Sequence, residues 1–304
     1  MAESEIHASN GRFFFGNTLL LCALLLAMVS TMGCEESVDP VLGTERAYTV
    51  YGFFNARADT QAMRIFAIEG SLALTRPEPL GARVISIDRQ TGTEQVWQDS
   101  VTRFVSGRFG HVYWSAFRAD FEHTYRLEAT RPDGAVTRAE VTVPPLSEPL
   151  LLPPTVADRF VFLPVLWPHA PRLNDIRVRY RILCDTVGRD FEFDYPLDQE
   201  QVSGGSVVTV QFSNDVRQIF QEVLGKCPVE DLHAEAVEVL VLVSNAEWVP
   251  PTGVYDAELL VEPGTFTNVD NGFGFVGAGY PATFRYEIPD SIAIAAGFFV
   301  DDDG

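Results

Sequence analysis

Two segments, Ile176–Ile182 (IRVRYRI) and Asp190–Tyr195 (DFEFDY), alternate strictly between apolar and charged residues. Side chains of a β-strand point to opposite faces at every second residue, so each segment has one apolar face and one charged face. In an antiparallel hairpin, the residue numbers of each opposed pair add up to the same constant. In one such register of these two segments, every arginine lies opposite an acidic residue. The predicted charge ladder places Arg177, Arg179 and Arg181 opposite Asp194, Glu192 and Asp190.

This register closes the hairpin around Asp185 and Thr186 and brings Tyr180 opposite Phe191 on the apolar face. A cross-strand pair contributes about 0.2–1 kcal/mol, so the ladder specifies the register more than it adds stability. An alternative is that the arginine row binds an anionic ligand.

Short strand-like segments of this kind recur along most of the chain, which predicts a mainly β protein. About seven of them, including one over Glu94–Val101, fall between residues 45 and 143, a spacing typical of an immunoglobulin-like β-sandwich. Prolines on both sides of Leu146–Leu152 indicate a semi-rigid linker or an edge crossover. The later half repeats the strand pattern, for example over Tyr255–Glu262, so we expect two β-sandwich (immunoglobulin-like) domains.

One helix is predicted in the second domain. Ser213 is placed to cap it, Gly225 to end it, and apolar residues recur at helical spacing from Val216 to Leu224. The expected organisation is a signal peptide over 1–33, a lipidated tether over 34–44, an N-terminal β-sandwich over 45–145, a proline-rich linker over 146–157, a C-terminal β-rich domain over 158–290 and an acidic tail over 291–304.

The N-terminal leader contains an uninterrupted apolar run, Leu19–Val29, that is too short for a bilayer span of roughly 20 residues but fits the apolar core of a secretory signal. The small residues that lead into Cys34 resemble the lipobox of bacterial lipoproteins. This resemblance implies cleavage before Cys34 and a diacylglycerol on its sulfur. The alternative is an uncleaved anchor over Phe13–Gly33.

Two further cysteines, Cys184 and Cys227, remain in the exported part of the chain, and an even pair in an oxidising compartment favours a disulfide. The alternative is two buried free thiols. No histidine is spaced from either cysteine as a zinc site requires.

The charge balance excludes one class of partner. With 42 acidic and 22 basic residues the formal net charge is −20, and nucleic-acid binding needs a basic surface. We therefore expect no nucleic-acid partner.

Catalytic and cofactor motifs are missing from the sequence, which has neither HExxH nor GxSxG. The segment Gly272–Gly277 (GFGFVG) matches the dinucleotide-binding string GxGxxG, but strand residues follow it where that motif needs a helix. A glycine-rich loop or a bulged strand is the preferred interpretation. We expect no catalytic residues, no metal site and no cofactor.

The same segment carries a resemblance. Asn268, Asn271, Gly272, Gly274 and Gly277 resemble the closing signature of a family of uncharacterised Bacteroidota lipoproteins, and Tyr48–Phe54 resembles the early strand of that family. The resemblance implies a β-rich outer-membrane lipoprotein of unknown activity, often encoded near TonB-dependent receptors.

Two functions are therefore expected from the sequence. The first is a non-enzymatic accessory or binding module, anchored by lipid in the outer membrane at the cell surface or the periplasmic face, that assists a TonB-dependent transporter. The alternative is a lipid-anchored hydrolase that acts on carbohydrate or peptide through carboxylates.

Overall fold

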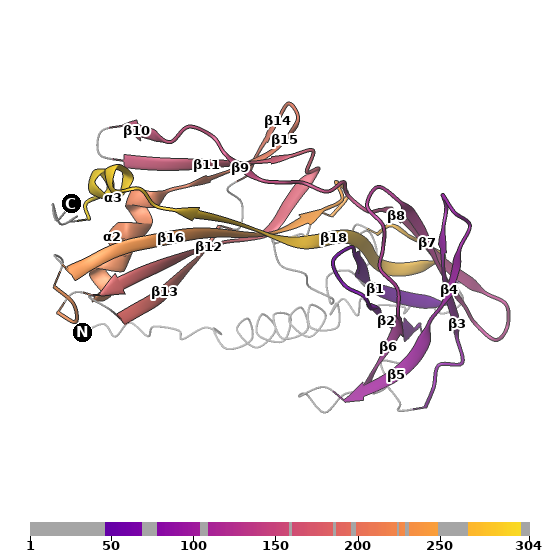
Figure 1. The fold of residues 1–304 in the computed structure, drawn as a ribbon. Coiled ribbons are helices and arrows are strands. Elements are labelled where there is room, and N and C mark those ends of the chain that lie inside the picture. The colour runs from indigo at the N-terminus through magenta and orange to yellow at the C-terminus, as the bar shows by residue number, and fades with distance from the viewer. Residues whose placement is uncertain are drawn as a thin grey trace, which may run out of the picture. The chain divides into compact units, whose positions relative to one another are not determined.

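The computed structural model describes residues 46–68, 78–103, 109–157, 160–184, 187–195, 199–223, 225–228, 231–248 and 267–298. Cys34, the turn at Asp185 and Thr186, the strand expected over Tyr255–Glu262 and the last six residues of the predicted acidic tail lie outside these residues. The described chain is mainly β, as the sequence predicts, and its strands form three sheets (Figure 1).

The largest sheet has eight strands, and its strands come from both halves of the chain. Their spatial order is β13 (Val187–Asp194), β12 (Arg172–Cys184), β16 (Leu232–Ser244), β18 (Gly272–Glu287), β1 (Tyr48–Asn55), β2 (Gln61–Ala67), β6 (Phe109–Ser115) and β5 (Gln98–Arg103). The centre of this order is a parallel pair, β1 and β18, aligned from Tyr48 with Gly272 to Asn55 with Gly279.

Two five-stranded sheets complete the β-structure. One has the order β17 (Val269–Asp270), β8 (Val136–Thr142), β7 (Thr124–Thr130), β3 (Arg83–Asp88) and β4 (Glu94–Val96). The other has the order β10 (Thr155–Ala157), β11 (Phe160–Pro168), β15 (Gly205–Val210) and β14 (Gln199–Val202), with β9 (Leu150–Leu151) also paired to β11.

The sheets pack in the manner of β-sandwiches. Phe54 on the eight-stranded sheet stacks on Tyr125 of β7 with ring centroids 5.0 Å apart. In the later half, the ring of Tyr180 stacks at 5.7 Å on Phe212, the first residue of α2 (Phe212–Val223). The division into two domains stays a prediction. The pairing of β1 with β18 places strands of both predicted domains in one sheet.

The segment predicted as a linker or edge crossover, 146–157, contains β9 and β10, which are both hydrogen-bonded to β11. It is therefore part of the sheet edge.

The single strand expected over Glu94–Val101 is divided by Trp97, and this part of the prediction is wrong. β4, before Trp97, pairs with β3, whereas β5, after it, pairs with β6 in the other sheet. The Trp97 indole is buried and donates to Ser86 Oγ over 2.9 Å. A buried ring between the sheets marks the point where the chain crosses over, which strand periodicity alone does not reveal.

The helix α2 confirms the predicted apolar spacing, since Val216, Ile219 and Val223 are all buried. The predicted cap is wrong. The helix begins one residue before Ser213, whose hydroxyl accepts a hydrogen bond from the Val161 N–H instead.

The structure also has a second helix, α3 (Asp290–Ala296), where the sequence predicted none. Its boundaries have clear causes: Pro289 before it is extended, and Gly297 after it adopts a left-handed conformation with φ of 102°. Within the described residues, no helix is long and apolar enough to cross a bilayer.

Candidate functional site

A groove lies between the edge strand β13 and the helix α2. It consists of two cavities of about 460 and 470 Å³, and Phe193 lines both. The strand side runs from Arg189 to Tyr195, and the helix side from Gln211 to Lys226. We call this feature the β13–α2 groove.

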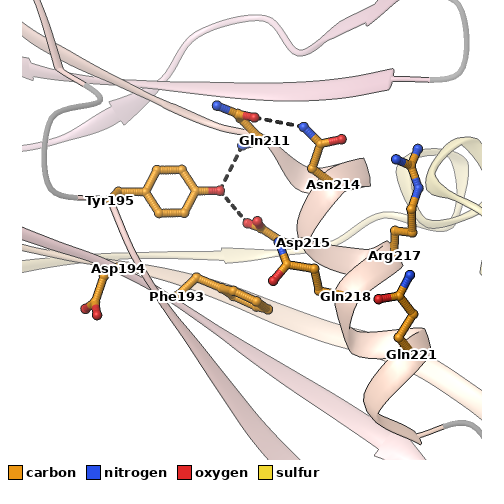
Figure 2. A pocket seen from close by; sticks show the side chains of 9 residues that line it. All are labelled: Phe193, Asp194, Tyr195, Gln211, Asn214, Asp215, Arg217, Gln218 and Gln221. Atoms are coloured by element: carbon orange, nitrogen blue, oxygen red, sulfur yellow. Dashed lines mark hydrogen bonds between the residues drawn. The ribbon is translucent and has the colours of Figure 1, made fainter. Parts of the chain in front are cut away.

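Strand periodicity decides which side chains of β13 face the groove. Phe191 and Phe193 are half-buried and pack against the core, and the ring of Phe193 meets that of Tyr180 edge to face at 5.7 Å. Figure 2 shows the Phe193 ring directed toward α2 and the Asp194 carboxylate directed away from it. The groove therefore has an aromatic floor. The ladder acids also border it, but their side chains project from the opposite face of β13.

A buried carboxylate fixes the start of α2. Asp215 is 4% exposed, and its Oδ2 accepts hydrogen bonds from the hydroxyls of Tyr180 and Tyr195. The Tyr195 hydroxyl also accepts from the backbone N–H of Gln211 over 3.1 Å, as Figure 2 shows. Burial, together with the neighbouring carboxylate, raises the pKa of Tyr180 far above its ordinary value. Tyr180 is therefore a permanent hydrogen-bond donor to Asp215 at physiological pH.

A disulfide fixes the other end of the helix. Cys184, the last residue of β12, is bonded to Cys227, which follows α2, so the predicted bridge is confirmed. The helix is thus tied to β12 at both ends of the groove, by the Tyr180–Asp215 hydrogen bond and by this disulfide.

The helix side of the groove is rich in amides. Gln211, Asn214, Gln218 and Gln221 recur at helical spacing, and Asn214 Nδ2 donates to Gln211 Oε1 over 2.8 Å. Carboxamides offer both donors and acceptors and suit a polar ligand. The amide spacing is visible in the sequence, but the hydrophobic periodicity that predicts the helix carries no signal for a site on its polar face.

The charge ladder has the register that the sequence predicts. Arg177 pairs with Asp194, Arg179 with Glu192, and Arg181 with Asp190. The ion pairs themselves deviate from strict opposition, because Arg177 and Arg179 both contact Glu192, at 3.1 and 2.9 Å. The hydrogen bond from Arg179 lowers the pKa of Glu192 below its ordinary value, with a further contribution from Arg177.

The ladder continues beyond the hairpin. Glu238 of β16 lies 3.6 Å from Arg179 and 3.0 Å from Arg285 of β18. Acidic and basic strands therefore alternate across four strands of the sheet. The arginine row predicted as an alternative anion site is flanked by acids on both sides.

A second group of polar side chains, which the sequence did not suggest, lies in the first half of the chain. Potential ligand atoms of Asp88, Asp120 and His123 lie within 4.8 Å of one another, and His123 Nδ1 is 2.8 Å from Asp88 Oδ2. Burial opposes ionisation of Asp88, but hydrogen bonds from His123 and from the backbone N–H groups of Gln90 and Thr91 outweigh it, so the pKa of Asp88 is lowered. We interpret this group as structural: hydrogen bonds within the turn hold the Asp88 carboxylate in place.

The residues of the family-like motif lie in and beside β18. A Cβ at Gly274 would collide with the Val50 carbonyl, and a Cβ at Gly277 with the Trp248 ring. Asn268 bonds both the N–H and the carbonyl of Val276 through its amide, at 2.9 and 2.7 Å. The motif therefore has a structural explanation in strand packing.

Two further motif residues connect this region to β8. Asn271 Nδ2 donates to the Val136 carbonyl over 2.9 Å, and Gly272 packs against Thr137.

Known proteins offer only weak structural likenesses to this chain. No protein-family model matches the chain, and no curated protein does. Among solved structures, it is similar to a pullulanase from Anoxybacillus sp. LM18-11 complexed with maltotriose (9% identity, 64% of this chain, 24% of that chain, TM-score 0.21). It is also similar to bovine butyrophilin (13% identity, 64% of this chain, 87% of that chain, TM-score 0.19).

The chain thus spans about a quarter of the pullulanase, and at these TM-scores neither likeness carries an argument about function. The class that the described fold defines is a mainly β protein of the sandwich type.

Proposed function

We propose that this protein is a lipid-anchored, non-enzymatic binding module of the bacterial outer membrane, which recognises its partner through the β13–α2 groove. Cys34 carries the lipid, and the tether that follows it holds the folded part at the membrane. The protein assists a TonB-dependent receptor, as the family resemblance implies.

The observation that carries this proposal is that the groove has fixed walls. α2 is tied to β12 near one end by the hydrogen bond between Tyr180 and Asp215, and near the other by the Cys184–Cys227 disulfide. A groove that is already formed before binding loses less conformational entropy when a ligand arrives. The disulfide also fits an oxidising compartment outside the cytoplasm.

The chemistry of the groove suits recognition better than acid–base catalysis. The Asp215 carboxylate is engaged by two phenol hydroxyls at its Oδ2, and a general base needs an accessible lone pair toward its substrate. The remaining lining groups are amides, aromatic rings, charged side chains and the aliphatic side chain of Val223. These groups bind and orient a ligand.

Two experiments test the two parts of the proposal. Cells that express the chain are labelled with radioactive palmitate, and we expect label in the wild type and none in Cys34→Ala. Label that persists in Cys34→Ala would contradict the anchor.

The second experiment tests the partner. A pull-down from native outer membranes should recover a TonB-dependent receptor with the wild type, and less with Gln218→Glu/Gln221→Glu, which adds charge to the rim of the groove. Equal recovery with both proteins would place the contact elsewhere, and recovery of no receptor would contradict the partner.

A further inference from the structure

The strand β13 is an edge of the largest sheet, and it borders the groove. In the described part of the chain, β13 pairs with β12 on one side and with no strand on the other. The Tyr195 N–H donates to the Ile176 carbonyl over 2.8 Å, so in this antiparallel register the backbone groups of the odd-numbered residues of β13 point to β12. The N–H and C=O groups of the even-numbered residues, among them Asp190, Glu192 and Asp194, therefore point outward, where a further strand can pair with them.

The two faces of β13 differ, and a strand added to its edge would meet both. The peptide backbone pairs with the edge in this mode of recognition, and its side chains lie alternately on one face and the other. On the face that borders α2, the added strand would meet the half-buried rings of Phe191 and Phe193. On the opposite face, its alternate side chains would lie beside Asp190, Glu192 and Asp194. The occupant must therefore match rings on one face and acids on the other.

The ring face favours apolar side chains. Charged side chains of either sign would lose hydration over Phe191 and Phe193, whereas apolar side chains gain by contact with these rings. Basic side chains would also meet like charges, since Arg189 and Lys226 line one end of this face beside Glu222. The apolar residues of an alternating segment therefore belong on the ring face.

The charge ladder has a regular order that stops at β13. Arg179 of β12 has Glu192 at 2.9 Å on one side and Glu238 of β16 at 3.6 Å on the other. Arg181 has the same arrangement, with acids of β13 and β16 on its two sides, and Glu238 in turn lies between Arg179 and Arg285. Within the described residues, the acids of β13 have arginines on one side only. A basic strand next to β13 would continue this alternation.

Asp194 adds an unpaired negative charge to the edge. Arg177, opposite it in the register, contacts Asp175 at 3.4 Å and Glu192 at 3.1 Å. Asp194 itself forms no ion pair with any described residue, and its carboxylate points away from α2 (Figure 2). If β13 of two copies paired, acids would lie beside acids, so the charges oppose a second copy of this chain as the occupant.

We propose that the β13–α2 groove binds an extended segment of a partner protein in which apolar and basic residues alternate, and that this segment pairs with β13 as an additional strand. Its apolar side chains lie on Phe191 and Phe193. Its basic side chains lie beside Asp190, Glu192 and Asp194, and the net charge of −20 attracts it from a distance. The inference rests on the proposed function, since it names the class of partner segment that this binding module recognises.

The test uses the full chain and a fluorescein-labelled peptide of twelve residues in which valine and arginine alternate, long enough to span the eight residues of β13. Fluorescence anisotropy should show that this peptide binds. A peptide of alternating valine and glutamate should bind at least tenfold more weakly, because its acids would lie beside the acids of β13.

A third peptide separates strand addition from general attraction between a basic peptide and an acidic protein. It has the composition of the valine–arginine peptide, but its valines and arginines follow one another in pairs. Residues of each kind then no longer share a face of the strand, so we expect at least tenfold weaker binding.

Backbone pairing is tested with two N-methylated versions of the valine–arginine peptide, one methylated on all valine amides and the other on all arginine amides. Because alternate N–H groups of a strand point to one edge, one version should lose binding and the other should keep it. Loss with methylated arginines indicates an antiparallel strand, and loss with methylated valines a parallel one.

Charge-reversed variants locate the peptide. Asp190→Lys/Asp194→Lys should weaken binding of the valine–arginine peptide at least tenfold and strengthen binding of the valine–glutamate peptide. The control Asp59→Lys/Glu94→Lys changes the net charge equally at two exposed acids in the first half of the chain and should leave binding of the valine–arginine peptide within threefold.

Hydrogen–deuterium exchange gives an independent readout on the unaltered chain. The N–H groups of Asp190 and Glu192 point outward, so the peptide should slow their exchange. Exchange in β5, the edge strand at the other end of the sheet, should not change.

Several results would overturn the inference. They are failure of the valine–arginine peptide to bind, equal binding of the alternating and paired sequences, equal binding of both N-methylated versions, and unchanged binding by Asp190→Lys/Asp194→Lys. A further one is a dimer in sedimentation whose formation protects β13, since the occupant would then be a second copy of this chain. If one of these occurs while the palmitate label and receptor recovery behave as expected, the inference fails and the proposed function stands.

Discussion

The hydroxyl of Tyr180 lies 2.5 Å from Asp215 Oδ2, and through this contact the middle of β12 holds the first turn of α2. Both residues are almost fully buried. A carboxylate away from water is stable only when its oxygens accept hydrogen bonds, and Asp215 accepts a second one from Tyr195. The position of one groove wall therefore depends on a single buried polar cluster.

Removal of the Tyr180 hydroxyl should destabilise the protein. In Tyr180→Phe, a buried carboxylate loses a charge-assisted donor, and such a loss amounts to about 1–3 kcal/mol. Urea unfolding measures the change. The control is Tyr286→Phe, since the Tyr286 hydroxyl forms no hydrogen bond within the described residues, and we expect a change below about 0.5 kcal/mol there. Equal stability of Tyr180→Phe and Tyr286→Phe would mean that the cluster does not hold the helix.

The disulfide should contribute more than the tyrosine. Cys184 and Cys227 are 43 residues apart, and closing a loop of this length stabilises a protein by roughly 3–4 kcal/mol on the chain-entropy model. Cys184→Ser/Cys227→Ser should therefore show a clearly lower denaturation midpoint. The oxidised wild type should approach the variant when dithiothreitol is added, and a midpoint that is unaffected by both treatments would contradict this account.

The sequence predicts well where a pattern is local. The register of β12 and β13 follows from a period of two and from matched charges at Arg179 and Glu192. The core face of α2 follows from the helical spacing of Val216 and Ile219. In each case the residues that determine the structure are near one another in the chain.

Long-range contacts explain what the sequence did not reveal. β1 lies beside β18, and Tyr48 is aligned there with Gly272, more than 200 residues later. Tyr180 and Asp215 are 35 residues apart, and neither has a local feature that indicates a buried pair. The groove depends on that pair and on an edge strand, so it becomes visible only once the tertiary structure is known.

The glycine motif gives a prediction that separates two causes of strain. Gly274 has φ of 98°, and an added Cβ would collide with the Val50 carbonyl of β1. Gly134 has φ of 93°, but no atom lies within 4 Å of its added Cβ. Gly134→Ala therefore measures the backbone conformation alone, about 1 kcal/mol, while Gly274→Ala should exceed about 3 kcal/mol.

Thermal unfolding of both variants tests this difference. If Gly274→Ala and Gly134→Ala shift the midpoint equally, close packing between β1 and β18 is not what requires glycine in the motif.

The turn around Asp88 predicts how stability depends on pH. In the folded protein, hydrogen bonds from His123 and from backbone N–H groups hold the pKa of Asp88 below its ordinary value, despite burial. A carboxyl with a depressed pKa contributes stability that is fully present above its unfolded pKa of about 4 and is lost as the pH falls through the folded pKa. Between about pH 5 and pH 2, the free energy of unfolding should thus fall more steeply in the wild type than in Asp88→Asn. His123→Gln removes one of the hydrogen bonds that lower this pKa, and its slope should lie between those of the wild type and Asp88→Asn.

Urea titrations at a series of pH values give these slopes. Parallel slopes for the wild type and Asp88→Asn would show that the ionised carboxylate does not stabilise the turn, and the free energy lost in acid would then have to come from other carboxylates, such as Glu192 in the charge ladder, whose pKa is also lowered.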